Sequence, residues 1–278
     1  MVQQYDKWLS GFQNQTLEVA DISTAVYSAP SMTDERQTVL LIHGVSGNFY
    51  GLVPLAYELR NEFNIVLVDL PSHGRSQNLS EDIQEKLDVW SENLVGSLGE
   101  AGIRVDSVLA HSFGCYLAPR MGCQKTWLIN PPAELRAFSV LYARLAYQTR
   151  AVIAPLYNLR WVERIRRWYM LPAQTGLVTQ RLNWSLDKGV ADKSQLLCQI
   201  AMMKEVLFQK RTFSSDYHAH GVVISRNDTV TKPTLGTLST NKLLITDSGH
   251  LSPAESPEII AKFIQGSNSV RTSATDIA

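Results

Sequence analysis

The stretch LAHSFGC, residues 109–115, places a serine directly after a short apolar run and before a segment of helical character. A sharp turn from strand to helix strains its central residue and exposes that side chain above the sheet, so the residues two before and two after it must be small. Ala110 and Gly114 meet this requirement around Ser112, although the usual motif has glycine at both positions. Ser112 is therefore either a nucleophile or a serine that caps the next helix, and the rest of the chain must decide.

Apolar, β-branched runs on both sides of this stretch predict strands, and near-continuous apolar strands are typical of a sheet covered by helices on both faces. They occur at 38–44, 64–70, 105–111, 125–130, 221–226 and 241–246, after an antiparallel pair predicted at 16–22 and 23–29. Helical patterns follow at 52–62, 81–98, 113–121 and 256–265, the second with Ser80 as its expected N-cap. This alternation predicts an α/β fold with a mostly parallel central β-sheet flanked by helices.

The alternation is interrupted between residues 133 and 215, a segment too long for a single crossover between strands. It is rich in Leu, Tyr, Trp and Arg and contains Pro155 and Pro172. We expect a helical cap, 133–215, inserted into a core formed by 1–132 and 216–267. The small and polar residues 268–278 predict a flexible C-terminal tail.

A serine nucleophile needs a base, and one of the six histidines is well placed for that role. His250 follows the last predicted strand in a loop of small residues, at the sheet edge where α/β folds place their chemistry. His111 precedes the serine and is expected to point away from it. The remaining histidines are read as turn, packing or surface residues: His43, His73, His218 and His220.

The orienting acid should follow another strand end. Asp228 lies just beyond the predicted strand 221–226 in a polar turn, where aspartate is also common for purely local reasons. Its competitor, Asp247, is only three residues before His250 and so is poorly placed to support the far side of that imidazole. We therefore predict Asp228 as the acid.

An anion pocket is predicted where the strand 38–44 ends in HGVSG. The main-chain N–H of Val45, paired with that of Phe113, could stabilise a developing oxyanion. Gly44 and Gly47 allow the backbone to approach a substrate closely. A plain β-turn is the alternative for the same residues, but their position at a strand end favours the anion pocket.

Outside the cap, residues 38–266 resemble the α/β-hydrolase fold family. The resemblance rests on five motifs, which are HGVSG, DLPSHGRS (69–76), AHSFG, RNDTV and SGH. Ser72 stands where glycine is common in that family. The resemblance implies Ser112 as nucleophile, His250 as base, Asp228 as orienting acid, and Val45 and Phe113 as oxyanion donors, with no metal or cofactor. The chain order Ser, Asp, His is that of this class, and serine at the turn argues against the dehalogenase and epoxide hydrolase branches, which carry aspartate there.

Composition limits the remaining choices. The 278 residues are 45% apolar with zero formal net charge, so bulk charge predicts no nucleic-acid partner. We find no apolar core of a signal peptide, no run long enough to span a membrane, and three cysteines without paired spacing, which together predict a cytoplasmic location.

Charge is unevenly distributed, because 133–215 holds 13 Lys and Arg against 5 Asp and Glu. Within it, NLRWVERIRRWYML (158–171) mixes arginine with aromatic residues. Arginines that only solvate a packed cap explain this pattern; contact of a basic cap with anionic lipid or an acyl carrier is the alternative. No nucleic-acid-binding motif accompanies the charge.

The predicted function is a serine hydrolase that cleaves a carboxylic ester or thioester, with a small-molecule substrate bearing a hydrophobic acyl group suggested by the apolar cap. Two alternatives stay open: a carbon–carbon bond hydrolase with the same triad, and a non-catalytic protein that binds a hydrophobic ligand. Acyl length, leaving group and oligomeric state are not predicted.

Overall fold

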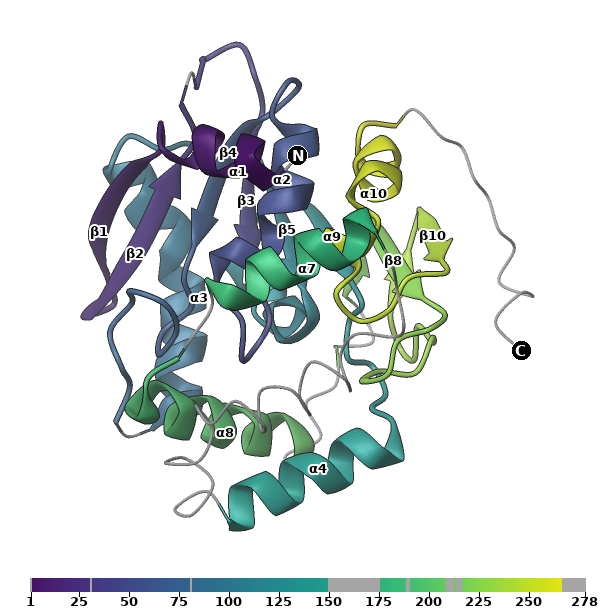
Figure 1. The fold of residues 1–278 in the computed structure, drawn as a ribbon. Coiled ribbons are helices and arrows are strands. Elements are labelled where there is room, and N and C mark those ends of the chain that lie inside the picture. The colour runs from purple at the N-terminus through teal and green to yellow at the C-terminus, as the bar shows by residue number, and fades with distance from the viewer. Residues whose placement is uncertain are drawn as a thin grey trace.

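The computed structural model describes residues 2–30, 32–80, 82–149, 176–188, 191–208, 213 and 217–266, with the main chain alone at 205–208. One eight-stranded sheet has the order β1-β2-β4-β3-β5-β6-β8-β10 (Figure 1). β1 (Gln13–Val19) and β2 (Ile22–Ser28) are antiparallel, and β2 is also antiparallel to β4. All other neighbours are parallel, which confirms the predicted α/β class.

The six parallel strands form the middle and one edge of the sheet. They are β3 (Thr38–Ile42), β4 (Asn64–Val68), β5 (Ser107–His111), β6 (Lys125–Ile129), β8 (Gly221–Ser225) and β10 (Leu243–Thr246). Alternate side chains enter opposite hydrophobic layers: Leu40 and Ile42 pack on one face, and Val39 and Leu41 on the other. Burial on both faces explains why these strands are almost continuously apolar. A separate two-stranded sheet pairs β7 (His218–Ala219) with β9 (Ser239–Thr240).

Helices cover both faces of the sheet. On one face lies α3 (Ile83–Glu100), which buries Leu87, Trp90, Leu94 and Leu98, together with the 3₁₀ turns η2 (Ser112–Tyr116) and η3 (Ala118–Met121). On the other lie α1 (Val2–Leu9), η1 (Phe49–Leu52), α2 (Val53–Leu59) and α10 (Pro257–Ile264), with α9 (Ser252–Glu255) just before α10.

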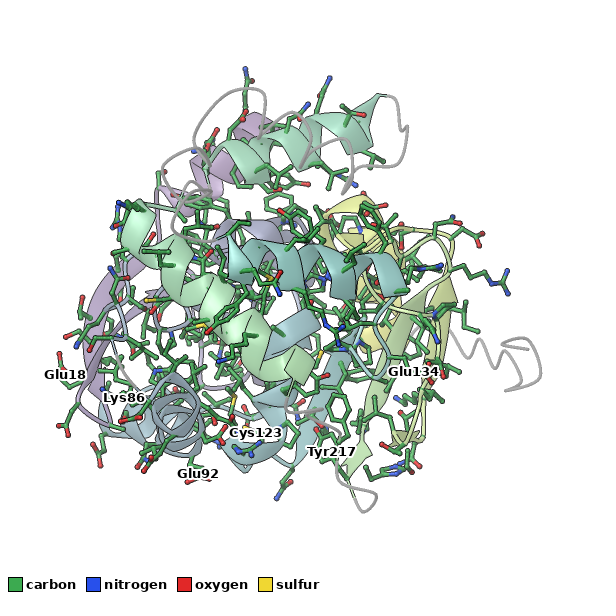
Figure 2. The ribbon with its side chains drawn as sticks, turned by 90° about the horizontal axis from the view of Figure 1, so that it is seen from below. Glu18, Lys86, Glu92, Cys123, Glu134 and Tyr217 are labelled. Atoms are coloured by element: carbon green, nitrogen blue, oxygen red, sulfur yellow. The ribbon has the colours of Figure 1, made fainter. Side chains whose placement is uncertain are left out.

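Between β6 and β8 the described chain contains α4 (Ala137–Gln148), α7 (Leu177–Asp187) and α8 (Lys193–Phe208). α4 and α8 lie side by side at the lower side of the molecule in Figure 1 and in front of the sheet in Figure 2. α7 packs instead against α9, η1 and α1. Its Trp184 contacts the ring of Tyr5 from α1. Residues 150–175 of the predicted cap, including 158–171, and the predicted tail 268–278 lie outside the described residues. The cap and its limits therefore stay a prediction.

Two local predictions are wrong. Residues 113–121 form η2 and η3 in place of one helix; Pro119 has no N–H to donate to residue 115, so an α-helical ladder cannot continue through it. Ser80 is not the N-cap of α3, which begins at Ile83 after Asp82 in a left-handed conformation without a side-chain cap bond. Across the described ranges, we find no helix that combines the length and hydropathy needed to cross a membrane.

Candidate active site

Ser112 is the first residue after β5, and its φ of +51° is a left-handed conformation that costs energy for a residue with a side chain. The small neighbours explain how the turn fits. A Cβ built on Gly114 would lie 2.7 Å from the main-chain oxygen of His43, so no larger residue is accommodated without a shift. Ala110 is fully buried. This is the strained strand-to-helix turn that the sequence predicts around Ser112.

The chain segments that directly follow β5, β8 and β10 bring Ser112, Asp228 and His250 together. His250 Nε2 is 2.9 Å from Ser112 Oγ, and His250 Nδ1 is 2.8 Å from Asp228 Oδ2. All three residues are buried. A neutral His250 with its proton on Nδ1 satisfies both contacts, because it donates to Asp228 and accepts from the Ser112 hydroxyl.

Asp228 is held as a carboxylate by its surroundings. Oδ1 accepts hydrogen bonds from the N–H groups of Val230 and Thr231, and Oδ2 accepts one from Thr231 Oγ1. Burial opposes the charge, but attraction to His250 and the hydrogen bonds from His250 and Thr231 outweigh it and lower the pKa of Asp228 to about 2. Asp247 is different: its side chain is 84% exposed and lies 3.7 Å from Arg226 Nη1.

Two further residues contact His250 through its main chain. His111 Nε2 lies 2.8 Å from the His250 carbonyl oxygen, and Asn130 Nδ2 lies 3.0 Å from it. Asn130 was not recognised in the sequence; its position at a strand end, before two prolines, was the available signal. His111 is turned toward the His250 loop. Burial and the neighbouring His250 lower the pKa of His111 to about 3, so it is neutral near pH 7.

The turn after β3 lies against Ser112. A Cβ built on Gly44 would come within 2.9 Å of Ser112 Cβ and 3.3 Å of its Oγ. Val45 follows in this turn and is partly exposed, whereas the buried Phe113 directly follows Ser112. The two main-chain N–H groups predicted to form an anion pocket therefore belong to segments that flank the Ser112 side chain.

Two buried histidines stabilise this turn. His43 Nδ1 donates to the Gly44 carbonyl at 2.8 Å, and its Nε2 accepts from Leu70 N–H at 3.0 Å. His73 Nε2 accepts from the N–H of Ser46, a residue with φ of +62°, at 3.2 Å. Burial lowers the pKa of His43 to about 4 and that of His73 to about 3. Both imidazole rings are therefore neutral near pH 7. Each uses its ring nitrogens to hold the turn after β3 through hydrogen bonds.

The buried side chain of Asp69, which lies outside the Ser112 site, holds the neighbouring turn after β4. Asp69 accepts hydrogen bonds from Tyr27 Oη at 2.7 Å, Phe49 N–H at 3.1 Å and Arg75 N–H at 3.0 Å. Burial raises its pKa, while these donors oppose that effect. A Cβ on Gly74, whose φ is +52°, would overlap Asp69 Oδ2, so glycine is required there. Asp69 thus joins β2, η1 and the turn after β4.

Helix α8 is tied to the same turn through main-chain acceptors. Gln199 Nε2 donates to the Ser72 carbonyl at 3.0 Å, and Gln195 Nε2 donates to that of Gly74 at 2.8 Å. Both glutamines are buried. These two hydrogen bonds therefore fix α8 against the turn after β4, the turn whose His73 contacts the loop after β3.

The sequence of this chain matches a known protein family over most of its length. The sequence profile described as "Alpha/beta hydrolase family" matches residues 39–263, most of the chain. The chain belongs to the alpha/beta hydrolase family. Its similarity to an individual curated protein is weaker: an uncharacterized hydrolase, YugF, of Bacillus subtilis (strain 168) is 21% identical over 174 residues. That match covers 62% of this chain and 60% of the relative, so it spans less than two thirds of the relative's length.

Solved structures share the alpha/beta hydrolase fold of this chain. A membrane phospholipase A, described as a bacterial virulence factor, superposes with a TM-score of 0.70 at 17% identity, covering 98% of this chain and 91% of that one. A hydrolase from Pseudomonas aeruginosa PA01 gives 0.68 at 17% identity, with 91% and 97% covered. The Cif epoxide hydrolase from Acinetobacter nosocomialis gives 0.66 at 13% identity, with 95% of each chain covered. At these identities the likeness extends to the fold alone.

Proposed function

We propose that the protein is a serine hydrolase that cleaves a carboxylic ester or thioester. The observation that carries this proposal is the continuous hydrogen-bonded series from Ser112 Oγ through His250 to Asp228, built on a strained turn. A serine hydroxyl is a weak nucleophile by itself and becomes reactive when an oriented base accepts its proton. In this proposal His250 is the base and Asp228 is the group that orients it.

The proposed reaction proceeds in two halves. Ser112 Oγ attacks the acyl carbonyl carbon while His250 Nε2 takes its proton, and the N–H groups of Val45 and Phe113 stabilise the oxyanion. His250 then gives the proton to the departing alkoxide or thiolate, leaving an acyl-enzyme. A water molecule, deprotonated by His250, attacks this ester. Collapse of the second intermediate releases the acid and returns the proton to Ser112.

The family includes other chemistries, and the residue at the turn bears on them. An epoxide hydrolase of this family uses an aspartate where this chain has Ser112, and a serine ether formed from an epoxide has no carbonyl for water to attack. A carbon–carbon bond hydrolase with the same triad is the remaining enzymatic alternative. Comparing the hydrolysis of p-nitrophenyl butyrate with the cleavage of a vinylogous diketone separates these two activities.

A fluorophosphonate probe tests the proposal directly, because it forms a stable bond only with an activated serine. We expect the wild type to be labelled and the Ser112→Ala and His250→Ala variants to remain unlabelled. Asp21→Ala is the matched control for alanine at a left-handed position, since Asp21 is exposed with φ of +61° in the β1–β2 turn. A folded wild type that neither reacts with the probe nor hydrolyses esters would contradict the proposal and favour the ligand-binding alternative.

The hydrophobic acyl group is proposed as part of the substrate. p-Nitrophenyl esters from acetate to decanoate provide the test, with kcat/KM as the measured quantity. We expect kcat/KM to rise with chain length, because burying one methylene contributes about 0.8 kcal/mol of binding energy. Equal values along the series would exclude an apolar acyl site.

We also propose that α4 contacts an anionic lipid surface. Its residues Phe138, Leu141, Tyr142 and Leu145 are 47–58% exposed and follow the spacing i, i+3, i+4, i+7, so they share one side of the helix. They are four of the seven exposed large hydrophobic residues in the described part of the chain. α4 contains no acidic residue and exposes Arg144, and the segment 133–215 carries an excess of basic residues. Apolar and basic groups on one helix are the features of interfacial binding.

Co-sedimentation with vesicles tests this second proposal. We expect the wild type to bind phosphatidylcholine vesicles containing phosphatidylglycerol more strongly than phosphatidylcholine alone, with binding that weakens as salt is raised. The double variant Leu141→Ser/Leu145→Ser should lose most of this binding. Ile259→Ser is the matched control, because Ile259 is also 50% exposed but lies on α10. Equal binding by the double variant, or binding to an acyl carrier protein with none to vesicles, would contradict it.

A further inference from the structure

The main-chain carbonyl of His250 accepts two side-chain hydrogen bonds from separate strand ends. His111 Nε2 donates at 2.8 Å and Asn130 Nδ2 at 3.0 Å. His111 ends β5, and Asn130 directly follows the neighbouring parallel strand β6. Both donors are buried, at 6% and 2% exposure, so water does not compete strongly for the carbonyl.

Asn130 also contacts both chain neighbours of this site, Gly249 before His250 and Ser252 at the start of α9. Its Nδ2 also lies 3.3 Å from the Gly249 carbonyl oxygen and 3.1 Å from Ser252 Oγ. Two carbonyl oxygens around this atom fix the orientation of the amide, because an oxygen in its place would face two other acceptors. Asn130 has φ of +48°, a conformation that asparagine tolerates better than most residues. Asparagine therefore meets both requirements of this position, the left-handed main chain and the side-chain N–H donor.

His111 supplies its hydrogen bond without a charge. Its ring centroid is 5.1 Å from that of His250, so a protonated His111 would disfavour the imidazolium that His250 must become during the reaction. As shown above, burial keeps His111 neutral near pH 7. A neutral ring with its proton on Nε2 holds the carbonyl and leaves the base free to accept a proton.

The two hydrogen bonds to the His250 carbonyl matter because the loop that carries His250 has no regular secondary structure to hold it. Residues 247–251, between β10 and α9, form no helix or strand. Fixing the His250 main chain sets the origin of its side chain, and with it the 2.9 Å approach to Ser112 and the 2.8 Å approach to Asp228. Proton transfer depends steeply on such distances.

We infer that Asn130 and His111 are positioning residues that hold the base His250 in register with Ser112 through its main-chain carbonyl. This inference rests on the proposed serine hydrolase function. A positioning role predicts a loss in kcat with little change in KM, since neither side chain is assigned a contact with substrate. A purely structural role predicts a lower stability with normal kcat in the folded protein.

Two pairs of variants test it, with kcat and KM measured on p-nitrophenyl butyrate. Asn130→Gly removes the donor but permits the left-handed backbone, and Asn130→Asp keeps the shape but replaces the donor with an acceptor. His111→Phe removes the donor but keeps a ring, whereas His111→Gln restores a neutral N–H donor. We expect kcat to fall about 10- to 100-fold in Asn130→Gly, Asn130→Asp and His111→Phe, with KM within about twofold of wild type. His111→Gln should recover kcat to within about threefold of wild type.

The control is Asp21→Gly, which makes the same kind of change at an exposed left-handed position far along the chain. Urea unfolding of every variant verifies that the assays are made on folded protein. Wild-type kcat in folded Asn130→Gly and His111→Phe would overturn the inference while leaving the proposed function intact. So would equal losses in His111→Phe and His111→Gln. A folded wild type with no esterase activity and no fluorophosphonate labelling would instead overturn the proposed function, and the inference with it.

Discussion

Gly44 lies directly against Ser112: a Cβ built on Gly44 would be 2.9 Å from Ser112 Cβ, closer than real Cβ atoms approach. The contact joins the turn after β3 to the turn after β5. These two strands are parallel neighbours in the sheet. The main-chain φ of Gly44 is not in the left-handed region, so the contact alone explains the need for glycine.

Gly44→Ala should therefore reduce activity without preventing folding. The added methyl must displace either Ser112 or the turn that carries Val45, and a displacement of about 1 Å at a reacting group can cost about 100-fold in rate. The measurement is kcat/KM on p-nitrophenyl butyrate. Gly51→Ala is the matched control, because a Cβ at Gly51 meets nothing within 4 Å. Equal activity in the two variants would contradict this role of Gly44.

Asp228→Asn should abolish most of the activity while the fold persists. The amide is similar in shape, but it cannot stabilise a charged His250 and it favours the wrong tautomer; by analogy with other Ser-His-Asp enzymes kcat should fall about 10³- to 10⁴-fold. Asp247→Asn is the matched control, because Asp247 is exposed and lies near Arg226. A comparable loss in Asp247→Asn would reverse the assignment of the acid.

The strands and the meeting of Ser112, Asp228 and His250 could be predicted because they follow from local patterns. Buried parallel strands are apolar along their whole length, and the carboxyl ends of such strands gather at one edge, so polar residues just after them converge. Each of the three residues lies just beyond a strand that the sequence predicts. A serine, a histidine and an aspartate at these points suggest a nucleophile, a base and an acid.

The support for these residues could not be predicted, because it depends on partners distant in sequence. Asn130 contacts the carbonyl of a residue 120 positions later, and its position at a strand end before two prolines does not identify that partner. His111 was expected only to point away from Ser112, and its contact with the His250 loop depends on how β10 and β5 lie in the folded sheet. The failure of one helix over 113–121 has a local cause in Pro119, which the apolar pattern concealed.

Acidification should destabilise the protein through its buried histidines. Burial lowers the pKa values of His43, His73 and His111 to about 4, 3 and 3, against about 6.5 in an unfolded chain. Between these limits the unfolded chain binds more protons, so stability is highest above about pH 6.5 and falls as the pH decreases. With all three groups titrating, the free energy of unfolding should fall by up to about 4 kcal/mol per pH unit.

Urea unfolding between pH 5 and 7 measures this slope. His111→Gln should reduce it by about one proton, or about 1.4 kcal/mol per pH unit. Gly51→Ala is the control, because it removes no titratable group and a Cβ at Gly51 meets nothing within 4 Å. A wild-type stability that does not change over this range would contradict neutral burial of the three rings.

The ion pair between Arg181 of α7 and Glu258 of α10 should contribute to stability, and the size of the loss should depend on which partner is removed. Arg181 Nη1 is 3.2 Å from Glu258 Oε2; the Arg181 side chain is 2% exposed and that of Glu258 is 44% exposed. Removing the arginine lets Glu258 recover water, whereas removing the glutamate takes away the carboxylate that both Nη atoms of the buried Arg181 contact. We expect Arg181→Met to lower the free energy of unfolding by about 1–2 kcal/mol and Glu258→Ala by about 3 kcal/mol. Lys232→Met, which breaks the half-exposed pair with Glu134, should cost less than about 1 kcal/mol. A larger loss in Arg181→Met than in Glu258→Ala would show that the packing of the Arg181 side chain, not its charge, holds α7 in place.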